Sequence, residues 1–143
     1  MQPVDPNQPS IALRYRTLLT LWFAMAMSLV IWLVLIHFVK ATNPVNLEVG
    51  LLLICLSLMP MSLSFLVKQI MLGKAIQQQN LMLVQQAYVV AWALCEASAL
   101  VGLLVHFVAG SPHYYAAFIV GGSGILLHFP QKKHLLAASG REF

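Results

Sequence analysis

The sequence predicts an all-α integral membrane protein, a four-transmembrane-helix bundle with its N- and C-termini in the cytoplasm. Of the 143 residues, 60% are hydrophobic and only 8% are charged, a composition that is not typical of a water-exposed surface. The apolar residues form four long runs, and a bilayer core about 30 Å thick needs roughly 20 apolar residues per helix. The basic residues lie mostly on one side of these runs, which is typical of multi-pass membrane proteins.

Turn residues separate the four apolar runs. Asn43-Pro44 marks the first turn because the residue before a proline disfavours helical geometry. Gly110, Ser111 and Pro112 mark the turn before the last run. Short polar tails are expected at residues 1–16 and 130–143, so the whole chain, 1–143, forms one transmembrane domain. The predicted spans are about 17–39, 47–67, 87–109 and 113–129.

Positive charge orients the chain in the membrane. Cytoplasmic loops carry an excess of Lys and Arg, and of the eight Lys and Arg residues only Lys40 lies on the side opposite to the others, which are Arg14, Arg16, Lys68, Lys74, Lys132, Lys133 and Arg141. Their side is therefore cytoplasmic, and an even number of spans places both termini there. We expect a multi-pass protein of the bacterial cytoplasmic (inner) membrane.

Aromatic residues and the C-terminal basic cluster predict architecture rather than chemistry. Trp and Tyr are enriched where helices meet the membrane surface, which fits Trp22, Trp32 and Trp92 together with Tyr15, Tyr88, Tyr114 and Tyr115. The cluster Lys132, Lys133, His134 and Arg141 is interpreted as a topology signal with secondary attraction to anionic lipid.

Glu96 is the one acidic residue in the interior of a predicted span, near the membrane centre, since Glu48 lies at the very start of the span 47–67. An unpaired carboxylate is costly at that depth, so we expect a neutral carboxyl that faces protein rather than lipid. Two interpretations stay open: a binding site for a proton or cation, and a structural hydrogen bond to a neighbouring helix or subunit. The predicted spans contain no Lys or Arg, which leaves hydroxyl groups as candidate partners: Ser57, Ser62, Ser64 and Ser123.

Part of the chain resembles a known family. Gly73-Lys74-Ala75-Ile76 and the later stretch AYVVAWALCEASALVGL, residues 87–103, resemble the loop and carboxylate-bearing helix of the proteolipid, or c-type, subunits of rotary ATP synthases. In that family the glutamate binds the translocated proton or sodium ion, and the loop faces the cytoplasm. The resemblance implies that Glu96 is an ion-binding residue and that the chain functions in energy conversion.

Small residues line the third and fourth predicted spans at intervals of four. Such residues let helix backbones approach closely, which is a main source of association energy in lipid. We expect them to pack these two helices together, with packing onto another subunit as the alternative. The helix-packing candidates are Ala91, Cys95, Ala99, Ala93, Ala97, Ser98, Gly102, Ala117 and Gly121.

His37 and His106 lie near the outer ends of the first and third spans, and so at similar depth. Two imidazoles at one depth can ligate a haem iron, and a single one can ligate the magnesium of chlorophyll. The structural alternative is a histidine whose polar tip lies among the lipid headgroups. No pair of histidines has the spacing typical of a zinc or iron site, so we expect no bound metal ion.

These features favour a small non-catalytic accessory subunit of a larger membrane complex. The sequence shows no nucleophile beside a base, no phosphate-binding glycine loop and no carboxylate pair, so we expect no enzymatic activity. The expected partners are membrane lipid and other integral membrane subunits, not nucleic acid or a soluble substrate. The alternatives are a proton- or cation-translocating protein that uses Glu96, and a subunit that binds haem or chlorophyll.

Overall fold

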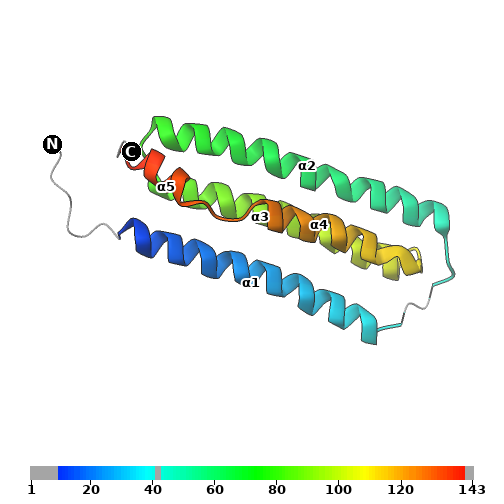
Figure 1. Cartoon of the computed structure of the whole chain (residues 1–143). Helices are drawn as coiled ribbons and strands as arrows, with labels where there is room; N and C mark the ends of the chain where they lie inside the picture. The colour runs from blue at the N-terminus through cyan, green and yellow to red at the C-terminus, as the bar shows by residue number, and fades with distance from the viewer. Residues whose placement is uncertain (1–9, 41–42, 141–143) are drawn as a thin grey trace.

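Three long helices dominate the structure, a computed structural model that describes residues 10–40 and 43–140. They are α1, Ile11–Phe38, α2, Leu47–Gln77, and α3, Leu81–Phe107. Each is long and apolar enough to cross a membrane, and at 1.5 Å per residue even α3 reaches about 40 Å. They run side by side (Figure 1), and the described residues contain helices and no strand.

The fourth apolar segment is a broken helix. A 3₁₀ turn, Pro112–Tyr114, leads into α4, Tyr115–Leu127, and residues 128–131 separate α4 from α5, Lys132–Ala138. Pro130 explains the break, because proline lacks an N–H and disfavours helical geometry in the residue before it. The 3₁₀ turn and α4 cover most of the predicted segment 113–129. Helix α4 alone reaches only about 20 Å, and α4, the break and α5 together run along α3 (Figure 1).

Helix α5 occupies part of the segment that was expected to be a polar tail, residues 130–143. Leu135 and Ala138 of α5 are completely buried. They pack in a core that also contains Leu18 of α1 and Leu72 of α2. The apolar side chains after the basic cluster therefore dock α5 onto the end of the bundle at which α1 begins.

Helix α3 is the centre of the bundle. It packs against α2, α4 and α1, whereas no Cα atom of α1 lies within 8 Å of one of α2 within the described residues. Buried side chains occur all along α3, but on α1 they are confined to Leu18, Leu29 and Ile36. The first helix is therefore attached to the bundle along one narrow stripe.

Glycines allow α4 to approach α3 closely. A Cβ atom placed on Gly121 would lie 2.5 Å from the backbone oxygen of Cys95 and 2.6 Å from Cβ of Ala99. A Cβ atom on Gly102 would lie 2.6 Å from the ring of Phe118. The neighbouring Gly122, in contrast, has nothing within 4 Å of such an atom, so only some of these glycines are required by the packing.

The two turns at the far end of the bundle bind one another. Gly110 adopts a φ of +57°, a left-handed conformation that favours glycine, and ends the turn after α3. The Asn46 backbone N–H donates to the Ala109 carbonyl at 2.8 Å, and the Asn43 side-chain amide donates to the Phe107 carbonyl at 2.6 Å. The turn before α2 is thereby tied to the end of α3.

Substituting Gly121 and Gly122 separately tests the packing of α4 on α3. We expect Gly121→Ala to lower the free energy of unfolding by about 1–3 kcal/mol, because the new methyl group meets the α3 backbone. Gly122→Ala should be neutral or stabilising by up to about 1 kcal/mol, since alanine favours a helix and the space is open. Unfolding in detergent micelles, followed by circular dichroism, measures both. Equal effects at the two positions would contradict the packing described.

Candidate functional site

Polar and aromatic side chains gather around the break in the fourth segment. They come from every long helix as well as from the break and α5, and we call them the break cluster: Trp22, Ser64, Lys68, Tyr88, Trp92, Cys95, His128 and His134. Trp92 lies about 16 Å along the axis from the start of α3. The cluster therefore lies well inside the bundle, away from its ends.

Three aromatic residues satisfy backbone groups that the break leaves without helical partners. The indole N–H of Trp22 donates to the Ile125 carbonyl at 2.9 Å, and that of Trp92 donates to the His128 carbonyl at 3.0 Å. The backbone N–H of Gln131 donates to the Tyr88 hydroxyl at 3.0 Å. In hydrocarbon an unpaired backbone group costs several kcal/mol, so these bonds permit a non-helical backbone there.

His128, at the start of the break, is 1% exposed and is bonded through both ring nitrogens. Its Nδ1 lies 3.4 Å from Nζ of Lys68, and its Nε2 lies 2.8 Å from Oγ of Ser64. An ammonium group can only donate, so Nδ1 accepts from Lys68. The ring proton is then assigned to Nε2, which donates to Ser64.

Lys68 is held without a carboxylate partner among the described residues. Besides His128, its ammonium group faces the ring of Tyr88, with Nζ 4.3 Å from the ring centre. A cation over an aromatic face is stabilised by the negative charge density of that face, more strongly where water is excluded. The ring and the imidazole therefore accommodate one positive charge inside the bundle.

His134 connects the cluster to α5. The Tyr88 hydroxyl already accepts from Gln131, so its own proton can be donated to Nδ1 of His134, 2.7 Å away. A neutral His134 is required for this bond, since a protonated Nδ1 cannot accept a hydrogen bond.

Glu96 lies on another face of α3 and pairs with α1. Its Oε1 is 2.6 Å from Oγ of Ser28, which also lies 2.8 Å from the Met25 carbonyl. The Ser28 hydroxyl donates its one proton either to Oε1 of Glu96 or to the Met25 carbonyl. The Glu96 side chain is half-buried.

The hydroxyls expected to bind Glu96 form other bonds, so that expectation is corrected. Ser57, Ser62, Ser64 and Ser123 each donate to a carbonyl in the preceding turn of their own helix. Ser28 could have been found from the sequence, because it lies about as far along the first helix as Glu96 does along the third. Two helices that run in the same direction place such residues at equal depth.

Most of the small helix-packing residues are buried within the chain. On α3 the buried ones are Ala91, Cys95, Ser98, Ala99 and Gly102, and on α4 they are Ala117 and Gly121. Ser98 donates to the Ser57 carbonyl of α2, so α3 uses its small residues towards both α2 and α4. Ala93 and Ala97 are exposed.

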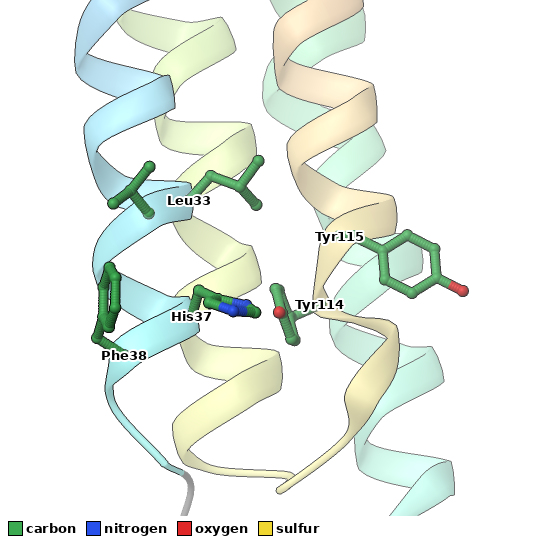
Figure 2. Close-up of a pocket in the computed structure, with 6 residues that line it drawn as sticks. Leu33, His37, Phe38, Tyr114 and Tyr115 are labelled. Atoms are coloured by element: carbon green, nitrogen blue, oxygen red, sulfur yellow. The ribbon is translucent and has the colours of Figure 1, made fainter.

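His37 and His106 have different surroundings. His106 is bonded through Nε2 to the Val39 carbonyl, at 2.8 Å, and its ring lies 5.0 Å from that of Tyr114. His37 points from α1 towards Tyr114 across a cavity (Figure 2). No group of three or more metal-ligating side chains occurs in the described ranges.

An apolar groove separates α1 from α4. Its outer part is a cavity of about 500 Å³, and the part nearer the middle of the bundle is a cavity of about 230 Å³. Leu33 lines both, so we treat them as one feature, the α1/α4 groove. The inner part is lined by Ala26, Leu29, Val30, Leu33, Phe118, Gly122, Ile125 and Leu126.

The bond that Nδ1 of His134 accepts from Tyr88 predicts a loss of stability in acid. A protonated Nδ1 cannot accept this bond, so the proton that an unfolded histidine binds as the pH falls through about 6.5 favours the unfolded state. We expect the unfolding temperature in detergent to fall between about pH 7 and about pH 5. His134→Asn should reduce this pH dependence, and an unchanged dependence would contradict the assigned bond to Tyr88.

Comparison of the chain with models of protein families, with curated proteins and with solved structures gave no match. Two features stand out in the described residues: the break cluster, whose side chains bond one another and the backbone of the break, and the α1/α4 groove, which is open.

Proposed function

We propose that this chain is a non-catalytic subunit of a larger membrane complex, in which it is held by helix packing. The α1/α4 groove is the observation that carries the proposal. It is apolar, it is open along the side of the bundle, and α1 is attached only along a narrow stripe. A helix of another subunit, with its side chains in the groove, would complete the packing of α1.

Small residues in the groove favour a protein helix over a lipid chain as its occupant. Gly122 of α4 has no atom within 4 Å of a Cβ placed on it, and Ala26 lines the same cavity from α1. Glycine and alanine let a second helix backbone approach, and this close packing drives association in lipid. The buried glycines of α4 pack against α3, whereas Gly122 has open space beside it and is available to a partner helix.

The proposed arrangement has four membrane crossings with both termini in the cytoplasm. The fourth crossing is made by α4, the break and α5 in succession, with the break supported inside the bundle by α1 and α3. The basic residues at the end where α1 begins favour this end as the cytoplasmic one. Lys40 remains at the opposite end.

A larger side chain in the α1/α4 groove should exclude the partner helix and so release the chain from its complex. We expect the full chain, extracted in mild detergent, to migrate with a larger assembly, and Gly122→Leu to shift it to the size of the free chain. Gly73→Leu is the matched control, because Gly73 is also open but lies on α2, away from the groove. Size-exclusion chromatography of both variants measures the shift. A wild-type chain that runs alone would refute the proposal.

The orientation is tested by labelling single cysteines with a membrane-impermeant maleimide. Added from outside intact cells, the reagent should label His113→Cys and leave Gln78→Cys unlabelled. Both positions are exposed and lie in turns at opposite ends of the bundle. The unsubstituted chain, with Cys55 and Cys95, sets the background. Labelling of Gln78→Cys in sealed cells would show the opposite orientation and contradict the proposed topology.

A further inference from the structure

The outer cavity of the α1/α4 groove has the size and lining of a binding site for a small molecule. Its volume is about 500 Å³, and such sites span roughly 300–1,000 Å³ and combine apolar and aromatic walls with a few polar groups. The cavity is lined by Leu33, Val34, His37, Phe38, Tyr114 and Tyr115. None of these side chains is a Lys, Arg, Asp or Glu, so the described lining matches an uncharged ligand better than a charged one.

Two polar groups of this lining are accessible to a ligand. His37 points from α1 towards Tyr114, which lies on the other side of the cavity (Figure 2). Neither the His37 ring nor the Tyr114 hydroxyl forms a hydrogen bond within the described ranges, and His37 is exposed while Tyr114 is half-buried. An imidazole and a phenol each have a proton to donate, and each can also accept a hydrogen bond when uncharged.

His106 of α3 holds the two sides of the cavity in place. Its Nε2 lies 2.8 Å from the Val39 carbonyl at the end of α1. Its ring packs edge-on against that of Tyr114, with 5.0 Å between the ring centres, an arrangement that aromatic pairs favour. The end of α1 and the 3₁₀ turn are thereby tied to the same residue, so the cavity is formed before any ligand binds.

We propose that the outer cavity binds the head ring of a membrane quinone. A quinone ring is flat and uncharged, which suits the aromatic side chains of Phe38 and Tyr114. Its carbonyl oxygens accept hydrogen bonds from His37 and Tyr114, and the hydroxyls of the reduced ring can donate to the same groups. The apolar tail of a quinone brings the ring to the cavity from the lipid.

Other lipids match the lining less well. An acyl chain would leave both His37 and Tyr114 without a partner. A phosphate headgroup is normally bound by Arg or Lys side chains, and the described lining contains neither.

The quinone site is separate from the site proposed for a partner helix. Gly122 and Ala26, on which the partner helix is proposed to pack, line the inner cavity and not the outer one. Quinone binding is measured on the free chain and assembly on the complex, so either proposal can fail without the other.

Titration of the full chain in detergent with decylubiquinone, a quinone with a short tail, tests the site by isothermal titration calorimetry. We expect saturable binding. Tyr114→Phe and His37→Phe should each weaken it about five-fold, because each variant removes one hydrogen bond and keeps an aromatic ring.

Tyr115→Phe and His113→Phe are the matched controls. The Tyr115 hydroxyl points away from His37 (Figure 2), and His113 is exposed at the same end of the bundle without lining the cavity. Each control should weaken binding less than about two-fold. Circular dichroism checks that all four variants retain the helical fold.

Three results would overturn the proposal. Equal binding by the wild-type chain, the cavity variants and the controls would show that the quinone only dissolves in the micelle. Equally tight binding of decylbenzene, which has no carbonyl oxygen, would show that the cavity accepts any apolar ring. A Soret absorption band in the purified chain that is lost in His37→Phe would show that the cavity holds a porphyrin ligated by His37 instead.

Discussion

A helix that breaks inside a helical bundle must find hydrogen-bond partners for the backbone groups that the break releases, and the structure depends on this constraint. Pro130, which is buried, interrupts the fourth apolar segment. The indoles of Trp22 and Trp92 and the hydroxyl of Tyr88 bond the released carbonyl and N–H groups. These three side chains allow a segment of two short helices to lie where an uninterrupted helix would otherwise be required.

The position of the other helices follows from this requirement. Two of the three partners belong to α3, so the broken segment must lie directly against it, and Gly121 removes the side chain that would prevent this. The third partner, Trp22, attaches α1 to the broken segment. Few other side chains of α1 are buried. Helix α1 is thus joined to the bundle at the break and at Ser28, and the α1/α4 groove remains open beside it.

The sequence predicts the helical class well because lipid imposes a strong compositional signal, and the runs around Trp32, Leu52 and Val101 all lie in long helices. The break and α5 are harder to predict from the sequence. Lys132 and Lys133 have the pattern of a terminal topology signal, so the segment after them was interpreted as a polar tail. It contains the apolar Leu135 and Ala138, which are buried. The break cluster was not predicted, because its members are distant in the sequence and Tyr88 and Trp92 fit interface anchoring equally well. The sequence locates Glu96 near mid-span, and equal depth in two parallel helices indicates Ser28 as a candidate partner. That α1 lies directly beside α3 is known only from the structure.

The break requires the indole N–H of Trp92, and replacing Trp92 with Phe tests this requirement most directly. Phenylalanine preserves most of the apolar packing but leaves the buried carbonyl of His128 without a donor. The expected loss is about 1–3 kcal/mol in the free energy of unfolding in detergent, with increased hydrogen exchange in residues 128–134. Trp32→Phe, at an exposed position of α1, should cost less than about 0.5 kcal/mol. If both variants lose the same stability and exchange at the break is unchanged, the indole does not support the break and the account fails.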